Sequence, residues 1–110
     1  MICSAGDIVV VPFPFVDVDA ERRRPSVVLS HETFNGTSRH TVCAMITTAA
    51  RSNWTGDIEI RDLATAGLRR RCVVRWKVFT LPNENILARL GSLGAADHAA
   101  VVQAGRSILL

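Results

Sequence analysis

The feature that most constrains this fold is a series of short apolar runs rich in β-branched side chains. Proline, glycine or asparagine repeatedly interrupts these runs. Runs of this length and composition are typical of strands. They predict strands at residues 8–13, 25–30, 41–47, 57–60, 72–76 and 78–80. Asn35 and Gly36 mark a predicted loop between the second run and the third.

Helical signals are confined to two places. Asp62 and Gly67 suit the N-cap and C-cap of a helix of one or two turns. Residues 94–110 predict a C-terminal helix with one apolar face. That face is formed by Asp97, Val101, Ala104 and Ile108, with Val102 and Leu109 beside it. The 110 residues are the size of one domain, 1–110. We therefore expect a mainly β (α+β) fold: a small, strongly bent antiparallel sheet or barrel capped by the C-terminal helix.

The cations of the chain are almost all arginines. The sequence has 13 Lys and Arg residues against 10 Asp and Glu, a formal charge of +3, and Lys77 is its one lysine. Arginine binds phosphate or carboxylate through two parallel hydrogen bonds, so this bias favours a polyanionic partner. A GC-rich genome, which favours arginine codons, explains the same composition equally well.

The cysteines and the N-terminal residues indicate in which cellular compartment the protein works. Cys3, Cys43 and Cys72 form no CxxC pair, and their odd number leaves no complete disulfide framework. Cys43 and Cys72 lie inside apolar runs and are predicted core residues, whereas Cys3 is predicted to be a terminal thiol. No signal peptide is recognisable, and no apolar stretch approaches the roughly 18 residues of a membrane span. We expect a soluble, cytoplasmic protein.

The segment VDVDAERRRP, residues 16–25, concentrates charge between the first two predicted strands. One interpretation is a solvated loop whose ions pair loosely, each exposed pair contributing about 0–1 kcal/mol. The other singles out Arg24, because a residue before proline is biased toward an extended conformation. An arginine held in this way at a sheet edge is suited to binding phosphate. Both interpretations stay open on these residues alone.

A second polar candidate closes the third predicted strand. Thr47 and Thr48 are followed by a polar loop that contains Arg51. Threonines at a strand end are usually β-formers with locally satisfied hydroxyl groups. Beside an arginine from a neighbouring strand, they could instead hydrogen-bond a phosphate group.

Other chemistries find little support. His31, His40 and His98 lack metal-ligand spacing, so we predict no metal and no cofactor. Trp54 and Trp76 could stack on nucleobases, at about 1–3 kcal/mol per base. They are equally suited to anchoring a core or a dimer interface.

Three segments form an ordered set of motifs: GDIVVVPFPF from Gly6, RRPSVVLS from Arg23 and MITTA from Met45. Together they resemble the MazF/PemK (Kid) family of type II toxins. The later segments GDIEI, AGLRRRCVVR and LGSLGAADHAAV are similar to its PemK-like branch. The resemblance spans nearly the whole chain.

This resemblance implies a small SH3-like β-barrel with a C-terminal helix, the CcdB/PemK-like toxin fold, usually as a homodimer. It also implies a metal-independent endoribonuclease, an mRNA interferase that cleaves single-stranded RNA. The implied partner is a cognate antitoxin whose acidic, disordered C-terminal segment covers the RNA groove. By motif position, Arg24 matches the catalytic arginine of the family and Thr47 its hydroxyl partner. The expected RNA-binding residues are Phe15, Arg23, Thr48 and Arg51.

Several alternatives stay open. The VDVDAE loop differs from the glycine-rich loop of better-known relatives, so the base preference is undetermined. Asp17, Asp19 and Glu21 are expected in a mobile flap over the groove, and Asp19 and Glu21 are candidates for the general base. The rival functions are a CcdB-like toxin that binds gyrase through residues 107–110 and a noncatalytic barrel that binds nucleic acid.

Overall fold

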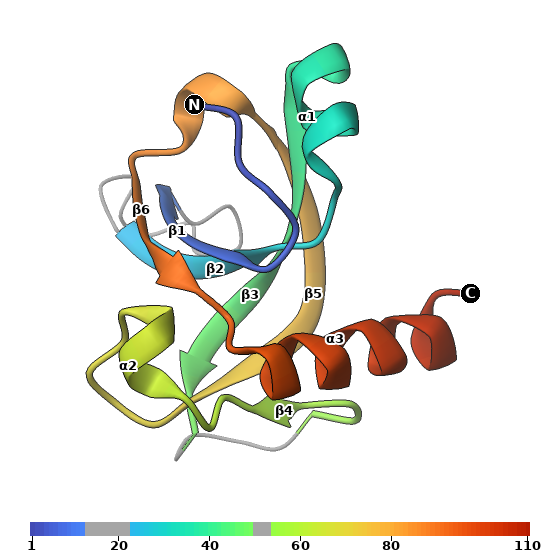
Figure 1. The fold of residues 1–110 in the computed structure, drawn as a ribbon. Helices are drawn as coiled ribbons and strands as arrows, with labels where there is room; N and C mark the ends of the chain where they lie inside the picture. The colour runs from blue at the N-terminus through green and yellow to red at the C-terminus, as the bar shows by residue number, and fades with distance from the viewer. Residues whose placement is uncertain (13–22, 50–53) are drawn as a thin grey trace.

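The computed structural model describes residues 1–12, 23–49 and 54–110 (Figure 1). Its elements are β1 (Asp7–Pro12), β2 (Arg23–Val28), α1 (Glu32–Ser38), β3 (His40–Thr48), β4 (Ile58–Glu59), α2 (Leu63–Ala66), β5 (Cys72–Pro82), the 3-10 turn η1 (Asn83–Asn85), β6 (Ala88–Ser92) and α3 (Ala95–Ile108). The described strands form one antiparallel sheet in the order β4-β5-β3-β2-β1-β6. The prediction of a mainly β antiparallel fold with a C-terminal helix is confirmed.

The sheet bends because its long strands are irregular. Ala44 of β3 pairs with Val78 of β5, yet the next residue, Met45, pairs with Arg75. The two extra residues on β5, at 76 and 77, form a bulge, which bends a strand and increases its twist. The sequence predicted two short strands here, but β5 is continuous from Cys72 to Pro82 and the predicted break is this bulge.

The bent sheet has a buried core on each face. One core contains Ile8, Val27, Ala44, Ile46, Val74 and Val101, and the other contains Cys3, Val9, Val11, Val28, Cys43 and Leu81. Neighbouring residues of a strand point to opposite faces, so strands covered on both sides read as continuous apolar runs. Cys3 is 2% exposed, and the prediction that it is a terminal thiol outside the core was wrong. Burial raises the pKa of the Cys43 thiol to about 12.

Two elements were missed by local sequence patterns. The predicted loop around Asn35 and Gly36 is the helix α1. Asn35 is fully buried, and its amide donates hydrogen bonds to the carbonyl oxygens of Cys3 (2.9 Å) and Ser30 (3.1 Å). These tertiary bonds hold a residue of turn propensity inside a helix. The strand β6, Ala88–Ser92, is likewise specified by its pairing with β1.

The two predicted helices are present. Asp62 caps α2 by accepting the Thr65 N–H, and Gly67 ends the helix at φ +74°. Asp97 in the first turn of α3 is buried and accepts the N–H groups of Arg61 (3.1 Å) and Asp62 (2.9 Å). This carboxylate therefore links α3 by hydrogen bonds to the segment that leads into α2.

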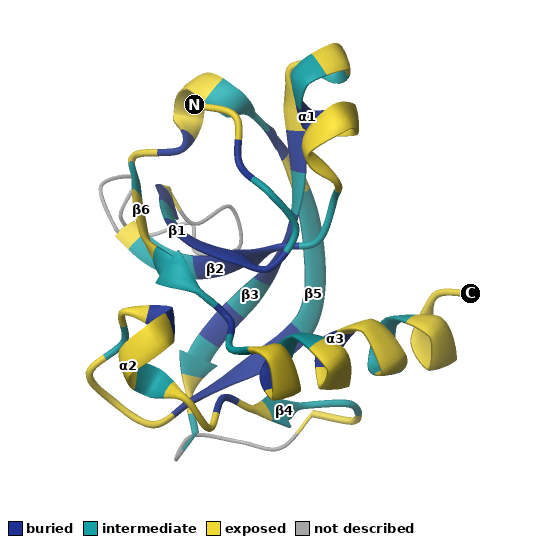
Figure 2. Ribbon diagram, viewed as in Figure 1, coloured by how far each residue is buried: buried dark blue, intermediate teal, exposed yellow. Residues whose placement is uncertain are grey.

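The C-terminal half of α3 is less buried than its periodicity predicted. Val101 lies in the core, but Ile108 is 44% exposed although it falls on the predicted apolar face. Figure 2 shows exposed residues dominating the end of this helix. Among the described helices, none is long and apolar enough to cross a membrane.

Candidate functional site

The candidate site lies where β2 and β3 stop pairing. Their ladder ends at Ser26 opposite Met45. The next residue of β2 is Pro25, which has no N–H to donate to a neighbouring strand. One residue further along β2 is Arg24, and the same register carried along β3 reaches Thr47. Arg24 and Thr47 therefore stand on the two sides of an opening in the sheet, which we call the β2–β3 gap.

Each side of the β2–β3 gap is held by a different neighbouring strand. Arg24 pairs with Val11 of β1, and Thr47 pairs with Val73 of β5. Both residues are half-buried. Cross-strand partners share a face of the sheet, so Arg24 lies on the face of Val11, which belongs to the core without α3. The two side chains are thus positioned by ordered backbone rather than by a free loop.

Of the other predicted site residues, two lie on the opposite face of the sheet, and the rest are outside the described residues. Arg23 and Thr48 are exposed at the ends of β2 and β3. Because strand neighbours alternate, they leave the sheet on the opposite face from Arg24 and Thr47. Phe15 and Arg51 lie outside the described residues, as do the acids Asp17, Asp19 and Glu21.

A small basic hollow adjoins the ends of β3 and β5. It has a volume of about 250 Å³ and is lined by Thr48, Ala49, Arg70 and Arg71. Arg71 is largely exposed and bonds to Glu59 through Nη2 at 2.9 Å, an exposed pair that contributes little to stability. The run of three arginines at 69–71 was the sequence signal for this hollow, but periodicity could not place it beside Thr48.

A buried ion pair lies across β3 from the β2–β3 gap, between β5 and the start of β4. Arg75, which pairs with Met45 across the sheet, is 5% exposed. Its Nε and Nη2 donate to the two carboxylate oxygens of Asp57 at 3.2 and 2.8 Å. Burial alone raises the pKa of Asp57, but the hydrogen bonds from Arg75 and from the Trp54 N–H, with the Arg75 charge, outweigh it and lower the pKa. Sequence reasoning missed this pair because Arg75 is embedded in an apolar run.

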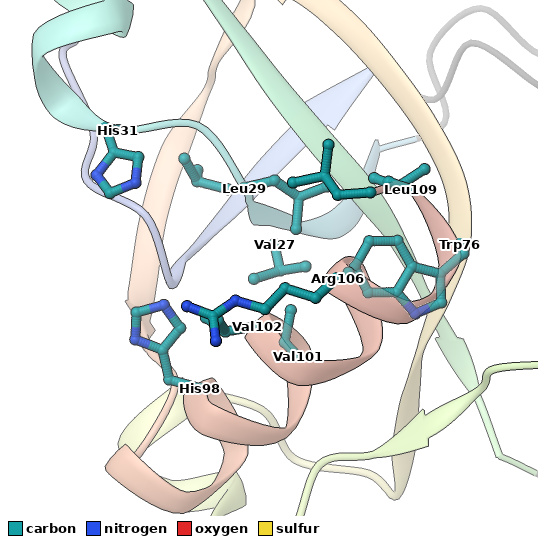
Figure 3. Close-up of a pocket in the computed structure, with 12 residues that line it drawn as sticks. Val27, Leu29, His31, Trp76, His98, Val101, Val102, Arg106 and Leu109 are labelled. Carbon is teal, nitrogen blue, oxygen red and sulfur yellow. The ribbon is translucent and has the colours of Figure 1, made fainter.

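A separate apolar groove of about 410 Å³ lies between the sheet and α3 (Figure 3). Its lining includes Val27, Leu29 and Trp76 from the sheet side and Val101, Val102 and Leu109 from α3. In Figure 3, His31 and His98 both lie toward one end of the groove, on opposite sides of it, and Trp76 lies toward the other end. The groove is on the α3 side, so it is distinct from the β2–β3 gap.

The part of the chain that the structure describes contains no cluster of three or more His, Cys, Asp or Glu residues arranged to hold a metal ion. Two of the described acids have structural partners: Asp57 binds Arg75, and Asp97 binds backbone N–H groups. At the β2–β3 gap, the guanidinium of Arg24 and the hydroxyl group of Thr47 both offer hydrogen-bond donors, which suit an anionic ligand.

Comparison with protein families matches residues 4–109 to the PemK-like, MazF-like toxins of type II toxin-antitoxin systems. No curated protein matches the sequence significantly.

Solved structures with the same fold are found at low sequence identity. A chain of the MazE-MazF crystal structure from Deinococcus radiodurans has a TM-score of 0.75 and 20% identity, over 100% of this chain and 98% of that one. The Mycobacterium tuberculosis toxin MazF-mt6 has a TM-score of 0.73 and 23% identity, over 94% and 97%. An endoribonuclease in complex with its cognate antitoxin, from a mycobacterial species, has a TM-score of 0.72 and 13% identity, over 96% and 91%. The expected toxin fold is confirmed.

Proposed function

This chain belongs to the PemK-like, MazF-like toxins of type II toxin-antitoxin systems, and from that premise we propose that it is an endoribonuclease that cuts single-stranded RNA in the cytoplasm. We treat residues 1–110 as a single toxin domain. The observation that carries the proposal is the placement of Arg24 and Thr47 on the two sides of the β2–β3 gap.

RNA carries its own nucleophile, and this shapes the proposed mechanism. The 2′-oxygen attacks the adjacent phosphorus while the P–O5′ bond breaks, which yields a 2′,3′-cyclic phosphate and a 5′-hydroxyl. The 2′-hydroxyl proton passes to a base, and the departing 5′-oxygen takes up a proton. The enzyme has to align these atoms and stabilise the charge that develops on the phosphoryl oxygens.

Arg24 and Thr47 are suited to that stabilisation. The planar guanidinium of Arg24 offers donors that match two phosphoryl oxygens, and Thr47 offers one hydroxyl donor from the other side of the gap. Arginine stays protonated at neutral pH, so Arg24 acts through charge rather than as the base. Asp19 and Glu21 remain the candidates for the group that accepts the 2′-hydroxyl proton.

The remaining cations extend the surface available to RNA. Arg70 and Arg71 line the hollow beside Thr48, where they can bind phosphates away from the cleaved bond. We include Arg23, Thr48, Phe15 and Arg51 as proposed RNA contacts. One similar structure is an endoribonuclease bound to its cognate antitoxin. We propose by extension that an antitoxin with an acidic, disordered C-terminal segment competes with RNA for these arginines.

Incubation with a long natural single-stranded RNA should produce cuts at discrete short sequences. Because the nucleophile belongs to the substrate, we expect the same cuts with and without EDTA, and no cutting of DNA of the same sequence. Primer extension maps the cuts, and end-group analysis identifies the cyclic phosphate. Loss of cutting on chelation would contradict the metal-independent mechanism. A folded protein that binds RNA but never cuts it would instead be a noncatalytic binding barrel.

We propose that the groove beside α3 receives a second copy of this chain. Leu109 is 56% exposed and Val102 is 43% exposed at its rim, and contiguous exposed apolar surface marks protein interfaces. The proposed homodimer would bury this surface in both copies.

Leu109→Glu should convert the dimer into a monomer, because two buried carboxylates would face an apolar surface without partners. Sedimentation velocity at micromolar protein concentration measures the change. Leu90→Glu is the matched control, since Leu90 is 42% exposed on β6 and does not line the groove. It should leave the dimer intact. A dimeric Leu109→Glu protein would show that α3 does not form the interface.

A further inference from the structure

Trp54 presents an indole ring to solvent next to two cations. The residue is 43% exposed and belongs to neither buried core. The Lys77 Nζ atom lies 4.8 Å from the ring centroid, and the Arg75 Cζ atom lies 5.7 Å from it. Both distances are within the range of cation–π attraction. The ring is therefore held against the sheet by electrostatic contacts while much of its surface stays accessible.

The backbone at Trp54 is also fixed. The Asp57 carboxylate accepts the Trp54 N–H at 3.2 Å, and the Asp57 N–H donates to the Trp54 carbonyl oxygen at 3.0 Å. Asp57 is itself anchored by the two hydrogen bonds from buried Arg75. An aromatic ring whose position is set in advance loses little conformational freedom when a ligand stacks on it.

The sheet register places this ring one strand away from the β2–β3 gap. Thr47 pairs with Val73, and Arg75 is two residues further along the same strand. Thr47 and Arg75 are therefore diagonal neighbours on one face, about 7–8 Å apart between α-carbons. Trp54 contacts Arg75 and therefore lies on the β5 side of β3, with that one strand between it and the gap, whereas Arg24 borders the gap on β2.

We propose that Trp54 is a stacking platform for a nucleobase of the RNA that flanks the cleaved phosphate; this inference rests on the proposed function. Sites for single-stranded nucleic acid combine aromatic rings for the bases with cations for the backbone. Trp54 supplies the first feature, and half-buried Lys77 supplies the second, whereas Arg75 is buried against Asp57 and orders the ring. Every base has an aromatic face, so the platform adds affinity more than sequence preference.

The test measures binding and cleavage with the same RNA sequence. The binding probe is a fluorescently labelled oligoribonucleotide spanning a mapped cut, with 2′-O-methyl groups that prevent cleavage. Trp54→Ala should weaken binding about 5- to 150-fold, since stacking contributes about 1–3 kcal/mol per base. Trp54→Phe should restore most of the affinity. For cleavable RNA, Trp54→Ala should raise KM by a similar factor and change kcat little.

Two controls separate base stacking from a general loss of exposed aromatic surface. Phe34→Ala removes an aromatic side chain that is 49% exposed on α1, away from the gap, and should leave RNA affinity unchanged. A probe with an abasic residue next to the cut should bind wild type and Trp54→Ala equally weakly, because the stacked base is missing. Such equality would support the platform.

Three outcomes would overturn the inference. Arg24-dependent cleavage with the same KM in wild type and Trp54→Ala would remove Trp54 from the site but leave the proposed function intact. A Trp54→Ala protein that loses dimerisation and keeps its RNA affinity would assign the ring to a protein contact. A folded wild type that neither binds nor cuts RNA would remove the proposed function and the platform together.

Discussion

Arg24→Ala should reduce RNA cleavage about a thousandfold or more, the scale seen when a preorganised donor to a developing oxyanion or phosphoryl charge is removed. The fold should survive, because Arg24 pairs with Val11 through its backbone and is only half-buried. Initial rates on a short RNA that contains one mapped cut measure the loss, and thermal unfolding monitored by circular dichroism checks the fold.

Two further variants define what Arg24 supplies. Arg24→Lys keeps the positive charge but loses the planar pair of donors, so we expect it to recover only part of the activity. Arg61→Ala is the matched control, because this exposed arginine lies near α3 on the other face of the sheet and should cut normally. If Arg24→Ala cut at the wild-type rate, the β2–β3 gap would not be the active site.

Arg75→Ala should lower the free energy of unfolding more than Arg24→Ala, Arg61→Ala or Arg71→Ala. It leaves the Asp57 carboxylate, 15% exposed, without its partner, and breaking a buried pair in this way costs about 3–5 kcal/mol. Urea unfolding measures the free energy. Arg71→Ala breaks a pair of the same chemistry whose side chains are 75% and 47% exposed, so it should cost less than about 1 kcal/mol. Equal losses for the two variants would show that burial does not determine the strength of these pairs.

The same ion pair should make stability sensitive to acid. The pKa of Asp57 is lower in the folded protein than the value near 3.9 of an unfolded chain. Its contribution is therefore fully present well above about pH 4 and is lost as the pH falls through the folded pKa. Unfolding free energies between about pH 6 and pH 3 should fall more steeply for wild type than for Asp57→Asn. Parallel curves would assign the acid sensitivity to other carboxyl groups.

The parts of the fold that depend on local chemistry were predictable from the sequence. β-branched runs and the prolines, glycines and asparagines between them located most of the strands. The caps at Asp62 and Gly67 located α2 because capping is decided within a few residues. The elements that were missed depend on distant partners. α1 is held by the buried amide of Asn35, and β6 is specified by pairing with β1.

For the candidate site, the sequence by itself determined the chemistry of Arg24 and Thr47 and their positions near strand ends. The proline that follows Arg24 and the apolar run that precedes Thr47 located them. It also identified the toxin family through motif order. Only the tertiary structure decided that the two residues stand on opposite sides of one gap, that Arg23 and Thr48 leave by the other face, and that Arg75 lies across β3 from the gap. Strand register and the β5 bulge produce these relations, and both arise from pairing between residues far apart in the chain.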